Sequence, residues 1–591
     1  MESLAVGPNP QTASAAAVHH SPAAPRIRLA FLCAAVFLGF IQLLANRNAM
    51  NVDGISYADM ADSYLRTGWA GLVNGQWSPL YPWLIAVAKS IVKPSAYWEF
   101  TLLHGVNFFT YLLAFAAFDF LMRQVIENQG GSLPQNQAPL PEPTLIAIGY
   151  TLFLWCSLGL ISIRQESPDM LMSGLVYLAA AIILQIRRSG TWIQMICLGA
   201  VLGLGYLAKA PMFPLAFVFL AIAFWLIRHQ KKAPVKLLLA TAVFFAVCAP
   251  LVIGLSRAKH RFTFGDSARL NVLWNIDRAG PLWYWQTLGS AGGKFEHRPE
   301  KIFQFPAVYK FDAPLPGTQP AWYDPSYWIE GAVPRFRARE QISLLAANLR
   351  IYADMLFVDQ APLLAVLVIL FSLSDTGLAK SISGQWPILI PALAALGMYA
   401  LILIETRYVG VFLALLWLGL FAGVRLPERS QFEKLGRATA LAIVIAVGIP
   451  VMLGVFRDAA QGLRHPAYPH WQVAQELHQA GVKKGDKVAR IGGTFGADWA
   501  RLLRARVVAE IPRYEAAHFW TAGPALQSEV IDTIGKTGAK AIVAEQIPPS
   551  EVFTAAPGWK RVGNTDFYVF VYEPASIGNG QSAPSVGNPR K

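Results

Sequence analysis

The chain has 591 residues, of which 54% are hydrophobic and 15% charged, and its mean hydropathy is +0.39. This composition excludes a soluble enzyme of that length, and the 18 Trp, 19 Tyr and 34 Phe fit a membrane protein with aromatic residues at its interfaces. The net charge of +14 lacks the clustered basic and aromatic runs of nucleic-acid binding, so we expect no nucleic acid but a membrane or a phosphate-bearing lipid as partner.

Residues 1–25 are predicted to be a disordered cytoplasmic tail, because they are rich in Ala, Pro, Ser and Gln. The apolar run that follows is long for a signal peptide and lacks a clear cleavage site, so we interpret it as an uncleaved first span. A span needs about 20 apolar residues. About eleven spans are predicted in an α-helical membrane domain at 26–456, with the segments 28–46, 98–122, 143–162, 168–186, 191–208, 211–228, 236–256, 358–374, 385–404, 407–424 and 438–456.

Short loops with excess Lys and Arg mark the cytoplasmic side of a membrane. Such loops contain Arg187 and Arg188, then Lys231 and Lys232, and they alternate with loops that carry a single basic residue. We therefore expect the amino terminus inside and the carboxyl terminus outside the cytoplasm. The basic loop 257–345 does not change this orientation, because long loops translocate largely regardless of charge.

Two large outer loops are predicted at 47–97 and 257–357. In the first, an apolar stretch of about a dozen residues after Trp83 is too short to cross and is predicted to lie in the interface. The second is rich in aromatic residues, Pro and Gly, which favours an ordered loop with short helices, ending in an interfacial helix near 339–356. Its Trp/Tyr series at 322–328 lines a groove or anchors the chain at the interface, and the sequence leaves both open.

Residues 457–575 have the patterning of a small soluble α/β domain, and 576–591 of a disordered tail. Gly492–Gly496 follows the first strand and either cradles a phosphate or forms an ordinary tight turn, since no complete nucleotide-binding motif surrounds it. The predicted elements are helices at 471–479, 497–504 and 524–537 and strands at 487–491, 506–511, 540–544 and 567–572.

Six ionisable residues fall at span ends on the same predicted side of the membrane. Such groups cost several kcal/mol each in or beside the hydrocarbon, so they are functional candidates. They indicate a polar site at one membrane surface rather than a pathway through the bilayer. The six are Asp53, Glu166, Asp169, Lys209, Glu405 and Arg407.

Each candidate also has an ordinary structural interpretation. Asp53 is either a base beside the membrane or the cap of a helix at 57–65, and Asp169 is also favoured in the first turn of a helix. Lys209 binds a phosphate or complements a helix carboxyl end, and Arg407 binds a phosphate or pairs with Glu405.

Other side chains with chemical potential look structural. His104 is predicted to be a packed histidine, and the histidines show no metal-ligand spacing, so no metal-binding residue is predicted. The four cysteines lie in apolar spans and are predicted to be core residues.

The motifs, in their order and on their common side, resemble the GT-C class of polytopic glycosyltransferases, similar to the protein O-mannosyltransferase and lipid A aminoarabinose transferase families. The resemblance covers roughly 28–424. Its motifs are Val-Asp-Gly-Ile-Ser-Tyr at 52–57, Trp-Ser-Pro-Leu-Tyr-Pro-Trp at 77–83, Ser-Pro-Asp at 167–169, Leu-Ala-Lys at 207–209 and Glu-Thr-Arg-Tyr at 405–408.

The resemblance implies transfer of a sugar from a polyprenyl-phosphate donor to a hydroxyl of a lipid, glycan or protein acceptor, with inversion, outside a bacterial inner membrane. Asp53 would be the general base, and Lys209 and Arg407 would bind the donor phosphate. The absence of a second acid beside Asp53 leaves a requirement for Mg²⁺ or Mn²⁺ open. The side chains implied to orient the substrates are Tyr57, Trp77, Tyr81, Glu166, Asp169 and Tyr408.

Two other functions stay open on the sequence alone. A transporter or flippase places polar residues near the bilayer midplane and is often built from repeats, whereas here the charges gather at one edge and no repeat is visible. A non-catalytic assembly factor would use the outer domain to bind proteins.

Overall fold

The computed structural model describes residues 21–130, 137–277, 292–311, 316–374, 382–427, 430–464, 468–492, 496–545 and 558–573. The chain divides into two compact units. The first comprises 1–298, 315–317 and 321–467, and the second 299–314, 318–320 and 468–591. The predicted tails at 1–25 and 576–591 lie outside the described residues, apart from residues 21–25.

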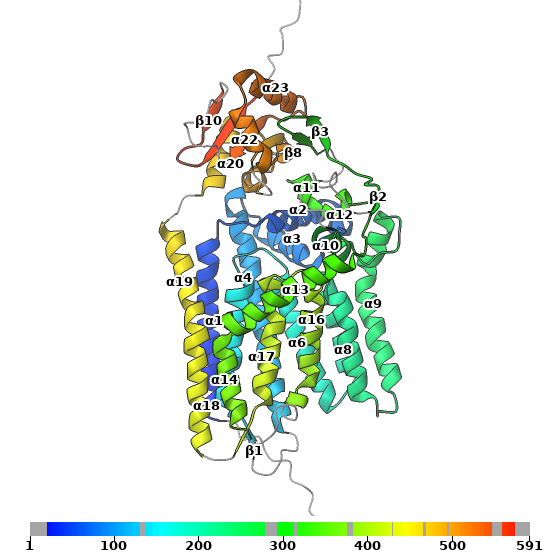
Figure 1. The fold of residues 1–591 in the computed structure, drawn as a ribbon, viewed down its shortest axis with the longest axis vertical. Coiled ribbons are helices and arrows are strands. Elements are labelled where there is room, and N and C mark those ends of the chain that lie inside the picture. Colours follow the sequence, from blue (N-terminus) through cyan, green and yellow to red (C-terminus); the bar gives the residue numbers. More distant parts are fainter. Residues whose placement is uncertain are drawn as a thin grey trace, which may run out of the picture. The chain divides into compact units, whose positions relative to one another are not determined.

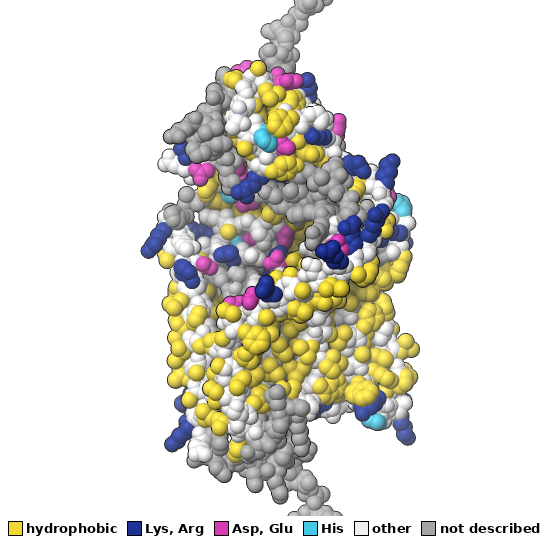
Figure 2. Space-filling view, viewed as in Figure 1, with side chains coloured by type: hydrophobic (Ala, Val, Ile, Leu, Met, Phe, Trp, Pro, Cys, Tyr) yellow, Lys and Arg dark blue, Asp and Glu magenta, His cyan; other side chains and the backbone are white. Residues whose placement is uncertain are grey.

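The first unit is helical and carries an apolar outer surface, as Figure 2 shows for one face. Seven of its described helices or helical runs are long and apolar enough to cross a membrane, and a pair bent by 72° makes an eighth. The chain is thus an integral membrane protein, and the predicted fold class, a polytopic helical protein with a carboxyl-terminal α/β domain, is confirmed. The count of eleven spans is not confirmed, because α7, α8 and α16 fall below the length of a span.

The long apolar helices of this unit agree with the predicted segments to within five residues, except for the last, predicted at 438–456, which runs from Ser430 to Arg464. They are α1 (Ala24–Asn46), α4 (Glu99–Glu127), α5 (Glu142–Leu154) continued by the π-helical η4 (Trp155–Ile161), α6 (Asp169–Arg188), α7 (Trp192–Ala208), α8 (Met212–Ile227), α9 (Ala233–Ala258), α14 (Ala361–Ser372), α16 (Trp386–Ala400), α17 (Thr406–Gly423), and α18 (Ser430–Ile443), η7 (Val444–Gly448) and α19 (Ile449–Arg464).

Shorter helices gather at one end of these long helices (Figure 1). Helices are present at both positions where interfacial helices were expected, as α3 and α13, and α13 with η6 forms the first arm of the bent pair. Exposed apolar side chains such as Ile91 on α3 and Leu349 on α13 suit that interface. These elements are α2 (Val52–Thr67), η1 (Gly68–Leu72), α3 (Leu80–Val92), η2 (Ala96–Trp98), α10 (Ser267–Asn275), α11 (Pro320–Tyr323), α12 (Pro325–Trp328), α13 (Ala338–Asp354) and η6 (Met355–Asp359).

Small connections complete the first unit. The described part has two two-stranded antiparallel ladders there, β1 with β6 and β2 with β5. Their bounds, with the remaining short helix, are η3 (Asn128–Gly130), β1 (Gln137–Pro139), β2 (Gly292–Gly293), β5 (Ala332–Val333) and β6 (Arg425–Pro427).

The second unit is a mixed sheet of seven described strands in the order β10-β11-β9-β7-β8-β4-β3, in which β9, β7 and β8 are parallel. Every element predicted for this domain is present within three residues of its expected bounds. The elements are β3 (Glu300–Phe303), β4 (Val308–Lys310), α20 (Pro469–Gln479), β7 (Lys487–Ile491), α21 (Asp498–Leu503), β8 (Arg506–Ile511), α22 (Arg513–Thr521), α23 (Pro524–Gly535), β9 (Ala541–Glu545), β10 (Trp559–Arg561) and β11 (Phe567–Val571).

The hairpin of β3 and β4 is the part of this sheet that we did not predict. It comes from the long outer loop of the membrane domain, and β4 pairs with β8 through Tyr309 and Lys310. Strands of three or four residues without clear alternation give little periodic signal, and their partner lies about 200 residues later. The second unit therefore includes residues that precede the last spans in the sequence.

A buried ion pair holds β7 to β8. The Arg490 guanidinium donates to Glu510 Oε2 from Nε at 2.8 Å and from Nη2 at 2.7 Å, and both side chains are almost fully buried. Removing one partner of such a pair leaves an uncompensated buried charge, which costs ~3–5 kcal/mol.

We predict that Arg490→Met strongly destabilises the sheet, while Lys560→Met, at the exposed pair with Glu476, costs at most ~1 kcal/mol. Hydrogen exchange of the β7 and β8 amides in the full-length protein measures both effects. Equal protection in the two variants would contradict the structural role of the buried pair.

Candidate active site

Asp53 lies in the first turn of α2 because the preceding Asn51 caps that helix. Asn51 Oδ1 accepts the Gly54 backbone N–H at 2.6 Å, so the interpretation of Asp53 as the cap is wrong, whereas the helix expected at 57–65 is present within α2. The Asp53 carboxylate accepts the Trp322 indole N–H at 3.2 Å and lies 3.1 Å from Arg407 Nη2. It is only partly exposed.

Arg407 connects two carboxylates from different helices. It lies in the first turn of α17, and its Nε is 3.9 Å from Asp169 Oδ2, in addition to its contact with Asp53. The alternative pairing with Glu405 is not what the structure has, since Arg407 turns toward these two acids and Glu405 is exposed.

Lys209 completes the charged group. It follows the last residue of α7, and its Nζ forms an ion pair with Asp169, the first residue of α6. The same ammonium lies 3.5 Å from the centroid of the Tyr408 ring. Two cations and two anions from four helix ends therefore meet, and their formal charges cancel.

These four side chains line a cavity of about 460 Å³. Tyr57, Trp77 and Tyr408 line it too, so the structure brings seven of the nine predicted site residues together. Among the described residues, the only charged ones in its lining are Asp53, Asp169, Lys209 and Arg407.

Glu166 and Tyr81, predicted to orient substrates, are not part of the lining. The Glu166 carboxylate is fully buried, 2.8 Å from His104 Nε2, and accepts the Asn51 backbone N–H at 3.1 Å. Tyr81 donates its hydroxyl to Asn107 Oδ1 at 2.5 Å and meets the Tyr57 ring edge-on. Both support α2 from outside the cavity: Glu166 contacts Asn51, two residues before Asp53, and Tyr81 contacts Tyr57.

Sequence reasoning missed one wall of the cavity. Residues Gln76 and Ser78, and Ser267, Asn271, Trp274 and Asn275 of α10, also line it. Uncharged amides and hydroxyls are common in any surface loop, so their types and spacing gave no signal that distinguishes them.

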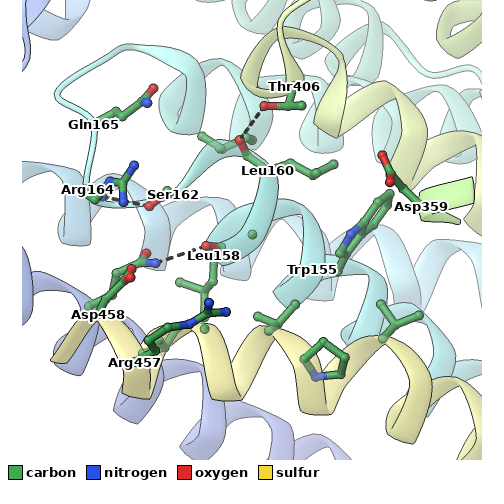
Figure 3. Close-up of a pocket in the computed structure, with 18 of the residues that line it drawn as sticks. Trp155, Leu158, Leu160, Ser162, Arg164, Gln165, Asp359, Thr406, Arg457 and Asp458 are labelled. Carbon is green, nitrogen blue, oxygen red and sulfur yellow. Dashed lines mark hydrogen bonds between the residues drawn. The ribbon is translucent and has the colours of Figure 1, made fainter. Parts of the chain in front are cut away.

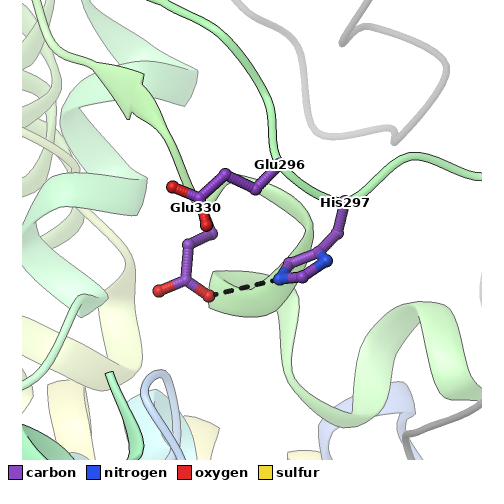
Figure 4. A group of neighbouring side chains, drawn as sticks. All are labelled: Glu296, His297 and Glu330. Atoms are coloured by element: carbon purple, nitrogen blue, oxygen red, sulfur yellow. Dashed lines mark ion pairs between the residues drawn. The ribbon is translucent and has the colours of Figure 1, made fainter. Parts of the chain in front are cut away.

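The described residues contain one group that could bind a metal ion, and it lies outside this cavity. Ligand atoms of Glu296, His297 and Glu330 lie within 4.8 Å of one another (Figure 4). The Lys259 ammonium is already 3.5 Å from Glu330. Within the cavity, Asp53 and Asp169 are each paired with a cation, so its acids do not fit a Mg²⁺ or Mn²⁺ ion in this arrangement.

A second cavity of about 590 Å³ is lined by Ser162, Arg164 and Gln165, which precede in sequence the stretch 167–169 that lines the first cavity (Figure 3). All three described π-helical segments, η4, η6 and η7, contribute to its lining, and such segments are frequent at functional sites. Figure 3 shows Arg457 and Asp458 of α19 on one side and Asp359 on the other. None of these residues was predicted.

No family model matches the chain. No curated protein matches it either. Among solved structures, the chain is similar to ArnT from Cupriavidus metallidurans bound to undecaprenyl phosphate, with 13% identity, 95% and 100% of the two chains covered, and a TM-score of 0.41.

The chain is also similar to the oligosaccharyltransferase AglB from Archaeoglobus fulgidus in complex with an inhibitory peptide and a dolichol-phosphate. The identity is 11%, the coverage 89% of this chain and 70% of that one, and the TM-score 0.43. A second structure of this oligosaccharyltransferase, in complex with Zn and sulfate, gives 13% identity, 86% and 67% coverage and a TM-score of 0.44. Likeness at these low scores leaves the function to be inferred from the site itself.

The charge of Lys209 is set by opposing effects. Burial and the nearby Arg407 lower the pKa of its ammonium to about 8, while the carboxylates of Asp169 and Asp53 oppose that shift. Lys209 therefore carries its positive charge below pH 8 and loses it as the pH rises further.

We predict that the affinity of the cavity for a soluble phosphate monoester falls as the pH rises through about 8. Lys209→Arg should remove this fall, because a guanidinium stays charged throughout that range. Calorimetric titration between pH 7 and 9.5 measures both curves. Parallel curves for the native protein and the variant would show that Lys209 does not bind the anion.

Proposed function

We propose that this protein is a membrane glycosyltransferase that moves a sugar from a polyprenyl-phosphate donor to an acceptor hydroxyl, with inversion at the anomeric carbon. The observation that carries the proposal is the meeting of two cations and two carboxylates from separate helix ends around one cavity, at the end of the long helices where the interfacial helices gather. A transfer between a lipid-linked donor and an acceptor needs an anion site and a base side by side in such a place.

The donor phosphate binds Lys209 and Arg407 in this proposal. Arg407 offers a planar guanidinium, which suits the paired oxygens of a phosphate, and Lys209 offers a compact charge; both cations lie over the Tyr408 ring. When the bond between the anomeric carbon and the phosphate oxygen breaks, negative charge develops on the leaving phosphate. Two fixed cations in a partly buried cavity stabilise that charge more strongly than water does.

Asp53 acts as the general base. In the structure its Oδ2 is held by Arg407, and the phosphodiester anion of the donor competes for that same guanidinium. Binding of the donor therefore weakens the Asp53–Arg407 contact and frees one carboxylate oxygen. Asp53 takes the proton of the acceptor hydroxyl while the hydroxyl oxygen bonds to the anomeric carbon and the phosphate leaves with the electron pair of the broken bond.

Asp169 and the aromatic wall have positioning roles. Asp169 is buried and bonded to Lys209, so it fixes the direction of the ammonium. Tyr57 and Trp77 meet edge-on with ring centroids 5.3 Å apart and form an apolar face of the cavity. Such faces exclude water from the reacting atoms.

The distribution of basic residues in short loops supports a reaction outside the cytoplasm, with the amino terminus inside and the second unit outside a bacterial inner membrane. The acceptor hydroxyl belongs to a lipid, a glycan or a protein that reaches this surface.

We predict that Asp53→Asn lowers the rate of sugar transfer about 10²- to 10⁴-fold, the usual range for losing a general base, without weakening the binding of polyprenyl phosphate. Purified full-length protein is incubated with a series of radiolabelled polyprenyl-phosphate sugars and a membrane extract, and labelled acceptor is counted.

The matched control is Asp458→Asn, in the second cavity, which should transfer at the native rate. Undiminished transfer by Asp53→Asn would remove Asp53 as the base. Vectorial uptake of the lipid by sealed vesicles, with no labelled acceptor, would instead indicate a transporter.

A further inference from the structure

The wall of the cavity that α10 provides differs in chemistry from the charged part. Ser267, Ala268, Asn271, Trp274 and Asn275 line the cavity, and their spacing of one, four, seven and eight positions places them on one helix face. The opposite face carries Leu270 and Leu273, which pack into a separate apolar cluster. The helix is therefore fixed by its apolar side and presents amides, a hydroxyl and an indole to the cavity.

Two polar atoms on this wall are buried without a hydrogen-bond partner in the described part of the chain. They are Gln76 Oε1, an acceptor, and Trp274 Nε1, a donor. An unsatisfied buried group costs ~1–3 kcal/mol, and most such groups in folded proteins are paired. One donor and one acceptor left together in the lining of the same cavity match a ligand group that both donates and accepts.

Ring stacking explains the position of Trp274, but it does not explain why the residue has an N–H group there. The ring stacks on Trp322 with centroids 5.8 Å apart and planes inclined by 6°, and a phenyl ring would stack as well. Trp322 in turn donates its indole N–H to Asp53. The unpaired Trp274 N–H thus belongs to a ring next to the one that touches the base.

We infer that Gln76 and Trp274 form the subsite for the donor's sugar ring and that this sugar is uncharged. A sugar hydroxyl donates to Gln76 Oε1 and accepts from Trp274 Nε1. The amides of Asn271 and Asn275, each of which also donates to a backbone carbonyl of α10, face neighbouring hydroxyls. This inference rests on the proposed transferase function and names its substrate class as a neutral hexose or pentose carried on a polyprenyl phosphate.

The same wall disfavours a charged sugar. Gln76 and the residues of α10 in the described lining carry no charge. An ammonium or carboxylate on the sugar would lose its hydration here without gaining an ion pair, which is costly. An amino sugar or a uronic acid should therefore bind more weakly than a neutral sugar on the same lipid.

The test separates the sugar from the phosphate. Full-length protein in lipid nanodiscs is titrated with polyprenyl phosphate, with the same lipid carrying a neutral hexose, and with the lipid carrying an amino hexose. We expect Trp274→Phe and Gln76→Leu each to weaken binding of the neutral glycolipid roughly five- to tenfold, about the value of one uncharged hydrogen bond, and to leave polyprenyl phosphate binding unchanged. The native protein should bind the neutral glycolipid more tightly than the amino one.

The control is Trp98→Phe, an exposed tryptophan outside the cavity, and the thermal melting of each variant is compared with that of the native protein. If the native protein binds polyprenyl phosphate and neither variant loses affinity for the neutral glycolipid, the subsite is wrong and the proposed function stands. Equal affinity of the native protein for the two glycolipids has the same consequence. If none of the three lipids binds, both the subsite and the proposed function are wrong.

Discussion

The candidate site depends on the pairing of Asp53 and Asp169 with Arg407 and Lys209. Each side chain comes from a different helix end, and each would be costly to bury alone at the edge of an apolar helical unit. Paired, they cancel in charge and hold α2, α6, α17 and the end of α7 around a shared space. The same pairing couples substrate binding to the reaction, because an incoming anion competes with the carboxylates for the cations.

A layer of buried polar contacts keeps that arrangement in place. Glu166 bonds to His104 and to the backbone of Asn51, and Asn51 caps α2 two residues before its first acid, Asp53. The expectation that His104 is a packed, hydrogen-bonded histidine is confirmed: its ring nitrogens lie 3.2 Å and 3.1 Å from two backbone carbonyls. Variation at Glu166 would therefore move Asp53 without touching a substrate.

Prediction from the sequence was most accurate where one local property of the residues was enough to identify an element. Apolar length located the helices, and the patterning of a soluble α/β domain located β7 and β8 to the residue. Ionisable residues at span ends are rare, so Asp53, Asp169, Lys209 and Arg407 were visible as a group, although their pairing was not. Two predictions failed for different reasons. Asn51 rather than Asp53 caps α2, a local choice between two residue types that cap helices about equally well. The β3–β4 hairpin joins a sheet formed mainly by later residues, which required tertiary knowledge. The Gln76–Trp274 wall was invisible because burial, not residue type, makes those two atoms unusual.

A structure of the full-length protein in a nanodisc with polyprenyl phosphate, determined by electron cryo-microscopy, tests the central claim most directly. The account predicts phosphate density within hydrogen-bond distance of both Arg407 and Lys209, and an Asp53–Arg407 separation longer than the present 3.1 Å. Phosphate held elsewhere, for example beside Arg457 in the second cavity, with the Asp53–Arg407 contact intact, would contradict it.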